Sequence, residues 1–458
     1  MVTIYLDKQV FSHLFNAKDE KYCRLREKIL LHKDEFIFFY SDGHLFDLQN
    51  DKSDKKFAEM EFIQSIVEGN YLIYKDFEQV VLRKSPCESF ATIGNVGDFS
   101  WLENIDFSQL TEEQRNVINN IVDISVKDFK GELDFDWLVT RIPISVDRTL
   151  VDKSTFVSIM QFISYNFYKN KESYKKLRDN IIARYNPTLI AAESENVFDE
   201  QLASSPIGLS FLSVVKAVLT QTGLSFTNSA LIYYVSYILL DLFGINKEAR
   251  KKVKFRNMQV DYIHSFFGSY CDCIVSDDEG LRCKSRTLYK LFNFSTKIYS
   301  IDEFIEKFDV AIANNRKNIG EYFGEIMDDY IAKQVIKTEV RPDSTLSFLS
   351  VTHEYFGYYN CMVEMKTKDG ITILLHKNND FNRPILAKEV EIVVNRLVKA
   401  FNDLGANWAK FEESVEFPLF KSDKWNRFLM LDDADVGITK FEGTPMLCLW
   451  IRLKHPIL

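Results

Sequence analysis

The sequence predicts an α/β protein with a parallel sheet and crossover helices, split by a helical insertion and followed by an α+β domain. Short apolar runs alternate with helical segments over residues 1–75 and again over residues 255–312, a pattern typical of parallel strands joined by helices. Residues 76–254 break this alternation and are mostly helical in pattern. Over residues 325–458, strand-like runs follow one another closely and indicate antiparallel pairing.

The first half opens on a β-rich run, Thr3–Leu6, with Asp7 directly after it. A second apolar run ends near Tyr40, where Ser41 or Asp42 is a plausible helix cap. We expect strands at 3–6, 35–40 and 71–74, and helices at 10–15, 19–32 and 51–68.

The insertion begins with an irregular stretch over residues 75–106 and continues with helical patterns at 108–130 and 153–185. A polar linker follows at 186–206, and then the most apolar stretch of the chain, 206–244. Its longest part free of charged and amide side chains, 229–240, is shorter than the ~20 residues of a membrane span. We therefore expect a pair of buried helices there.

The second half begins with an amphipathic helix. Val260, Ile263 and Phe267 recur at helical spacing and form its apolar face, and a more polar face carries Asp261, His264, Ser265 and Gly268. The apolar run 271–275 has the length of a buried strand. A helix to residue 288, a strand at 296–299 and a helix with Ser300 and Glu303 as a capping box complete the α/β pattern.

The C-terminal α+β domain has no role that the sequence reveals. Its strands are expected at 346–352, 359–366 and 371–376, with a turn at Asp369-Gly370 between the last two. An amphipathic helix covers 388–404, and further strands follow residue 408.

Composition limits the class of protein. The chain has 458 residues, a formal net charge of −9 and seven scattered cysteines. The acidic balance argues against a nonspecific DNA coat, although it leaves room for nucleic-acid enzymes with local basic patches. With so few cysteines and no secretory signal ahead of the first strand, we expect a reduced, cytoplasmic protein outside membranes.

Four acidic residues stand at strand ends or on the helices that face them: Asp7, Asp47, Asp261 and Asp278. A parallel sheet brings such positions together at one edge, where α/β proteins bind ligands. Clustered carboxylates repel one another, so we expect them to hold a hard cation, Mg²⁺ or Mn²⁺. Such a cation lowers the pKa of bound water and stabilises charge on a phosphoryl group, as phosphodiester hydrolysis requires.

These segments resemble the PIN domain. The resemblance lies in Ile4-Tyr5-Leu6-Asp7 with Val10-Phe11-Ser12, in Tyr40-Ser41 followed by Asp47, in Asp261, and in the run from Cys271 to Leu281. It covers residues 1–75 and 255–310. The family consists largely of Mg²⁺/Mn²⁺-dependent ribonucleases with three or four acidic ligands, so it implies a metal-dependent endoribonuclease, of a toxin-like or antiviral-defence kind.

The chain departs from that family in two ways. Its second acid is usually Glu, whereas here it is Asp47, with Asp42 and Glu61 as rivals. The family also runs without the insertion that separates the two halves here, and the C-terminal domain resembles no family.

Neighbouring residues have secondary roles. Ser276 is expected to hydrogen-bond a site carboxylate or water, Asp277 to be a neighbour of the ligands, and Asp272 to be a structural cap. His264 could contact a metal or phosphate, but a surface or packing role is expected for it. Cys271, Cys273 and Cys283 lack zinc-site spacing and are interpreted as buried thiols.

Basic residues near the acids could hold an RNA backbone, or could form a solvated helix face. They are Lys251, Lys252, Lys254, Arg256, Arg282 and Lys284. RNA is therefore the expected partner, with a protein regulator or a second copy of the chain as further possibilities. Two alternatives stay open: a catalytically inactive binding or scaffolding module, and a DNA nuclease on the same scaffold.

Overall fold

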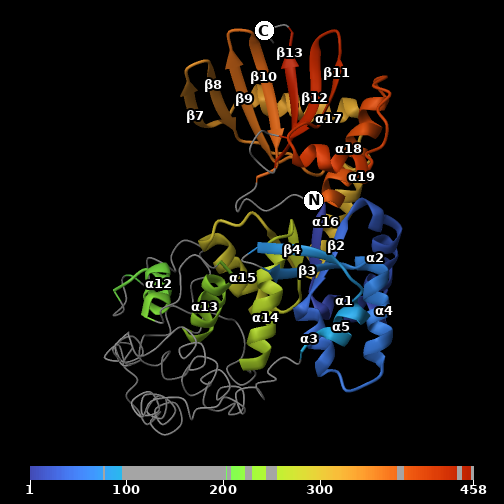
Figure 1. Ribbon diagram of the computed structural model, residues 1–458, viewed down its shortest axis with the longest axis vertical. Helices are drawn as coiled ribbons and strands as arrows, with labels where there is room; N and C mark the ends of the chain where they lie inside the picture. The colour runs from blue at the N-terminus through green and yellow to red at the C-terminus, as the bar shows by residue number, and fades with distance from the viewer. Residues whose placement is uncertain are drawn as a thin grey trace.

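The computed structural model describes residues 1–75, 78–94, 203, 208–221, 229–243, 255–378, 386–440 and 446–454 (Figure 1). Within them, the chain forms a six-stranded sheet of order β4-β3-β2-β1-β5-β6 and a seven-stranded sheet of order β11-β12-β13-β10-β9-β8-β7. The protein is therefore mixed α/β, with a mostly parallel sheet in one part and an antiparallel sheet in the other.

The six-stranded sheet joins the two halves of the α/β pattern. Ile4 on β1 lies beside Phe38 on β2 and Cys273 on β5, so strands from before and after the insertion are direct neighbours. All pairs are parallel except β3 with β4. The strands are β1 (Thr3–Leu6), β2 (Ile37–Ser41), β3 (Asn70–Lys75), β4 (Glu78–Arg83), β5 (Cys273–Val275) and β6 (Lys297–Tyr299).

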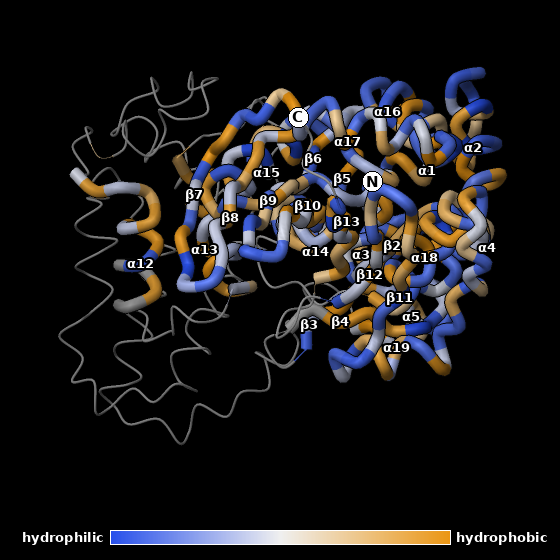
Figure 2. Tube along the Cα trace, turned by 90° about the horizontal axis from the view of Figure 1, so that it is seen from above, coloured by the Kyte–Doolittle hydropathy of each residue, from blue (hydrophilic) through white to orange (hydrophobic). Residues whose placement is uncertain are grey.

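Helices cover both faces of this sheet because its strands are apolar on both sides. On β1, Ile4 and Leu6 pack into one core and Tyr5 into the other. The first core is closed by α1 (Lys8–Asn16), α2 (Glu20–His32), α4 (Lys55–Val67) and α16 (Ile301–Asn314). The second is closed by α13 (Ser229–Leu242), α14 (Phe255–Gly268) and α15 (Glu279–Leu291). The outer helices α2, α4 and α16 alternate between hydrophilic and hydrophobic residues along the chain (Figure 2).

The described part of the insertion agrees in part with expectation. The apolar stretch forms two helices, α12 (Phe211–Gln221) and α13, as predicted. The stretch expected to be irregular instead contains β4 and α5 (Pro86–Thr92), which begins at a capping box of Ser85 and Glu88. The helices expected at 108–130 and 153–185 lie outside the described residues, as does nearly all of the expected linker at 186–206.

The C-terminal part begins with α17 (Ile319–Ala332). Its sheet contains β7 (Val335–Arg341), β8 (Ser344–Leu349), β9 (Cys361–Thr367), β10 (Gly370–His376), β11 (Asn426–Met430), β12 (Ala434–Lys440) and β13 (Leu447–Leu453). Every neighbouring pair is antiparallel. The helices α18 (Ala387–Asn402) and α19 (Glu413–Lys421) complete it, and residues such as Val393 and Leu397 of α18 share one core with Ile373 and Leu449 of the sheet.

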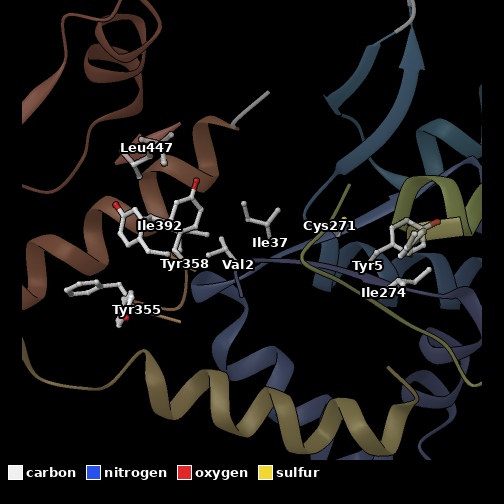
Figure 3. Packing of buried hydrophobic residues seen from close by; sticks show 14 of the residues in the cluster. Val2, Tyr5, Ile37, Cys271, Ile274, Tyr355, Tyr358, Ile392 and Leu447 are labelled. Atoms are coloured by element: carbon white, nitrogen blue, oxygen red, sulfur yellow. The ribbon is translucent and has the colours of Figure 1, made fainter. Parts of the chain in front are cut away.

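The two parts share a packed junction. Val2 and Ile37 of the first sheet lie beside Tyr358 and Ile392 (Figure 3). The Arg396 guanidinium donates hydrogen bonds to the carbonyl oxygens of Phe356, at 2.7 Å, and Glu35, at 3.0 Å. No helix in the described ranges is long and apolar enough to cross a bilayer.

Candidate metal site

The proposed ligands come from four separate elements. Asp7 follows β1 and begins α1, and its backbone N–H donates to Val275 O at the end of β5. Asp47 lies on α3 (Asp42–Asn50), which begins at the predicted cap Ser41. Asp261 lies on α14. Asp278 caps α15, with its side chain accepting a hydrogen bond from the backbone of that helix. The parallel strand ends therefore bring residues from both halves to one region.

Three side chains form a compact group: Asp7, Asp47 and His264. His264 Nε2 lies 3.1 Å from Asp47 Oδ2 and 3.7 Å from Asp7 Oδ1, and all potential ligand atoms lie within 4.8 Å of one another. The His264 side chain is 1% exposed and that of Asp7 9%, whereas that of Asp47 is 32% exposed. Asp47 is therefore the member of the group that solvent reaches most easily.

A buried network fixes the His264 ring. The Tyr5 hydroxyl lies 2.8 Å from His264 Nδ1 and 2.6 Å from the Ser41 hydroxyl. His44 Nε2–H donates to Leu6 O at 2.7 Å, while its Nδ1 accepts from the Ser41 backbone N–H at 3.1 Å. Burial lowers the pKa of His44 well below its usual range, which suits a neutral ring in this role. His264 thus presents Nε2 to the carboxylates from a fixed position.

Gly43 makes room for that ring. A Cβ at this position would lie 2.9 Å from His264 Cε1 and 3.0 Å from Nδ1. A rigid imidazole cannot yield as the end of a flexible chain does, so any larger residue here would push α3 and α14 apart. The close packing of these two helices is what brings Asp47 to His264.

Burial and neighbouring charges shift the pKa values of Asp7 and His264. Burial raises the pKa of Asp7, although the charge of His264 and the hydrogen bond from Ser276 oppose this shift. For His264, burial opposes the charged form, but the hydrogen bond to Asp47 and the charges of Asp7 and Asp47 together raise its pKa. The carboxylates thus favour a positive charge at this position, which a bound cation would supply.

Asp261 lies outside the compact group but within its electrostatic reach. Burial raises its pKa well above the usual range; the charge of Lys284 opposes this, and the charges of Asp278, Asp47 and Asp7 reinforce it. Asp278 likewise contributes to the raised pKa of Asp7. The charges of the other three predicted acids therefore act on Asp261, and those of Asp47 and Asp278 act on Asp7.

The residues around them have defined partners. Ser276 Oγ–H donates to Asp7 Oδ2 at 2.6 Å, and the Asp278 backbone N–H donates to the same hydroxyl at 3.0 Å. Asp277 Oδ1 accepts from the Ile301 backbone N–H at 2.9 Å, so that carboxylate is bound to the start of α16. The Asp272 carboxylate accepts hydrogen bonds from the backbone N–H groups of Val2 and Thr3, and so holds the start of β1 in place.

The donor set suits a divalent cation of the first transition row. Two carboxylates and one imidazole nitrogen, with further acids close by, fit Mn²⁺ well, whereas Mg²⁺ prefers oxygen ligands alone. The network behind His264 resembles the outer hydrogen bonds that orient metal-binding imidazoles in general. Of the two cations expected from the sequence, Mn²⁺ suits this mixed set of oxygen and nitrogen donors better than Mg²⁺ does.

The buried ring of His264 packs against Tyr5 and His44 as expected, and it also faces two carboxylates, so it is a candidate ligand as well. The spacing of three residues from Asp261, which places both on one side of a helix, was the available signal. The polar face of α14 is also buried at Ser265, which contacts Tyr233 and Ser285 at 2.5 and 2.6 Å.

The rivals for the second acid point elsewhere: Asp42 binds the Tyr71 hydroxyl, and Glu61 is exposed on α4.

Of the residues expected to contact RNA, the structure describes the side chains of Arg282 and Lys284. Lys284 is 1% exposed and pairs with buried Asp241 of α13 at 3.4 Å, so it is not a surface contact for a phosphate backbone. The guanidinium of Arg282 donates to Ser276 O at 2.8 Å, which leaves it only partly accessible. Lys251, Lys252, Lys254 and the side chain of Arg256 lie outside the described residues. Cys271 and Cys273 are buried thiols as predicted, and Cys283 is half-buried.

No protein-family model, curated protein or solved structure matches the chain. What bears on the function is therefore the geometry of this site and the resemblance of its sequence segments to the PIN domain.

Proposed function

We propose that the protein is a metal-dependent endoribonuclease, with a PIN-like domain that hydrolyses RNA phosphodiester bonds at the site around Asp7. The observation that carries the proposal is the convergence of Asp7, Asp47 and His264 at the strand ends, with Asp261 and Asp278 close enough to act on them. The strand order β3-β2-β1-β5-β6, parallel throughout, supports it because it places β1 and β5 side by side.

Each residue has a distinct part in the proposed reaction. Asp7, Asp47 and His264 would hold the cation, and Asp261 and Asp278 would complete its coordination or hold a second one. A cation bound there supplies a more acidic water and stabilises charge on the phosphoryl group. Ser276 fixes one oxygen of Asp7, so that carboxylate presents its other oxygen in a constant direction. No side-chain nucleophile is required.

The test is cleavage of labelled single-stranded RNA and single-stranded DNA with Mn²⁺, with Mg²⁺ and with EDTA. We expect cleavage of RNA that requires the cation and falls at least about 100-fold in Asp7→Asn and in Asp278→Asn, since each removes charge where the transition state needs it. Glu279→Gln is the matched control, because Glu279 is exposed beside Asp278 and should leave the rate unchanged.

The outcomes separate the alternatives. Undiminished cleavage by both Asp variants would contradict the assignment of the site, and preferential cleavage of DNA would support a DNA nuclease. An absence of cleavage together with an absence of thermal stabilisation by Mn²⁺ would favour an inactive binding or scaffolding module, because a cation that binds only the folded state must raise its stability.

A further inference from the structure

The strand β7 lies at one edge of the C-terminal sheet (Figure 1). One of its sides pairs with β8, from Val335 opposite Leu349 to Arg341 opposite Ser344, with a register shift between Val335 and Lys337 and a regular ladder from Lys337 onward. Among the residues that the structure describes, no strand lies along its other side. Such an edge is a template for pairing with another chain.

This edge is unusually apolar for an exposed segment. Four large apolar side chains between residues 331 and 340 are highly exposed: Ile331 (67%), Val335 (49%), Ile336 (72%) and Val340 (81%). Within β7 all side chains except Glu339 are exposed. An exposed edge strand with apolar side chains promotes association unless a partner covers it.

The sequence of β7 is self-complementary about Thr338. In an antiparallel pair of two copies centred on Thr338, Ile336 of each copy faces Val340 of the other, and Lys337 faces Glu339. Lys337 and Glu339 are two residues apart and already form an ion pair of 2.6 Å within the strand, so they lie on the same face of the sheet. The pairing therefore matches apolar with apolar residues and opposite charges with each other from Ile336 to Val340, whereas Val335 faces Arg341 at each end.

We propose that two copies of this chain associate through β7, which pairs antiparallel with itself across a two-fold axis at Thr338 and makes one continuous sheet of the two C-terminal sheets. The charges favour a second copy over an unrelated strand. A lysine on an edge strand ordinarily opposes pairing, but in this register each ammonium group meets a carboxylate. Like charges directly opposite each other are unfavourable, so other registers are disfavoured.

The opposite edge of the same sheet provides a contrast. On β11, a two-fold pair centred on Phe428 would place Arg427 opposite Leu429 and Asn426 opposite Met430, which matches neither charge nor polarity. The Arg427 guanidinium is also occupied by Glu416 at 2.7 Å. Self-pairing is therefore specific to β7 among the two edges of this sheet.

The first test measures mass by sedimentation over a range of concentrations. A single pair of edge strands buries less than the ~1,600 Å² of an ordinary stable interface, so we expect a reversible dimer with a dissociation constant on the order of micromolar. Lys337→Glu places two carboxylates opposite two carboxylates, and Glu339→Lys places two ammonium groups opposite two ammonium groups. We expect each variant alone to dimerise about tenfold more weakly.

An equimolar mixture of the two variants is the decisive sample. The carboxylates of K337E then face the ammonium groups of E339K at every charged pair, so the mixture should dimerise at least as well as the wild type. A wild type that stays monomeric at about 100 μM, or variants that dimerise as the wild type does, would overturn the proposal.

A second test uses geometry alone. Directly opposite residues in an antiparallel pair have Cα atoms about 4.5 to 5.5 Å apart, a separation that a disulfide can bridge. Thr338→Cys, in a Cys87→Ser background that removes the one fully exposed native thiol among the described cysteines, should form a cross-linked dimer on mild oxidation. Arg341→Cys is the control, because its two copies would lie roughly 20 Å apart along the strands. Equal cross-linking of both variants would contradict the register.

Discussion

At the residue level, the His264 imidazole is the group toward which the two nearest carboxylates converge. A nitrogen ligand lowers the preference of a site for Mg²⁺ and suits Mn²⁺ better. We expect Mn²⁺ to raise the melting temperature at lower concentrations than Mg²⁺ does. His264→Gln should weaken the response to Mn²⁺ by about tenfold or more, measured as the MnCl₂ concentration that gives half of the stabilisation.

His13→Gln provides the comparison for this experiment. His13 lies on α1, stacked on Tyr22 and away from the carboxylates, so its replacement should leave the response to Mn²⁺ unchanged. An equal response of H264Q and the wild type would remove His264 from the proposed ligand set and leave it a packing role alone.

Asp261 offers a prediction about stability. Because its pKa is raised well above the usual range, the folded state keeps this proton at a pH where the unfolded chain has lost it. The folded state then binds more protons than the unfolded state, so stability falls as the pH rises above about 4. In EDTA at pH 7.5, Asp261→Asn should raise the melting temperature, while the stabilisation by Mn²⁺ is reduced or lost.

The matched measurement uses Glu279→Gln, an exposed neighbour of the site on α15. This variant should leave both the melting temperature in EDTA and the response to Mn²⁺ unchanged. A lower melting temperature for D261N would contradict this prediction. It would show that the Asp261 carboxyl group stabilises the fold in the absence of metal.

At the level of elements, Asp329 near the end of α17 ties this helix to the chain between β8 and β9. Its carboxylate accepts hydrogen bonds from Thr352, both backbone and hydroxyl, and from the Tyr355 hydroxyl. Burial alone would raise the pKa of Asp329, but these hydrogen bonds and the one from His353 lower the pKa to about 2. The stabilisation is therefore complete above pH 4 and disappears as the pH falls from about 4 through 2.

Asp329→Asn should accordingly lower the free energy of unfolding at pH 7 by about 2 kcal/mol, the equivalent of a shift of this size. Its stability should also depend less on pH between 4 and 2 than that of the wild type. Urea unfolding across this range measures both effects. Asp328→Asn, at the exposed neighbouring position, should change neither; a pH dependence of D329N identical to that of the wild type would contradict the assignment.

Elements with a clear apolar period were predictable, and elements without one were not. The run Thr3–Leu6 gave β1 with its observed bounds, and the Ser300–Glu303 capping box opens α16 as expected. The strand β7 has no buried side, so the alternation that marks a half-buried strand is missing from its sequence. The helix α19 contains Pro418, which argues against a helix in any local interpretation.

At the level of the whole molecule, the four acids could be identified from the sequence, but their positions relative to one another could not. Their convergence depends on β1 lying between β2 and β5 and on α3 packing against α14 around Gly43. The contacts of β1 with β5 and of α3 with α14 join residues more than 200 positions apart, and no local pattern encodes them. The buried pair of Lys284 with Asp241 of the insertion was missed because a basic run in sequence gives no sign of burial.

The central place of β1 also has a consequence for synthesis of the chain on the ribosome. Leu6 pairs with Val275, and between their translation the ribosome makes the whole insertion. At rates of ~5 to 20 residues per second, this interval lasts roughly 10 to 50 s. Throughout it, β1 has β2 on one side but lacks β5 on the other, and Asp7 lacks His264, Ser276 and Asp278. The proposed nuclease activity would therefore arise only after most of the α/β domain has been translated, so that it could not act earlier on the messenger that encodes the chain or on the ribosome that makes it.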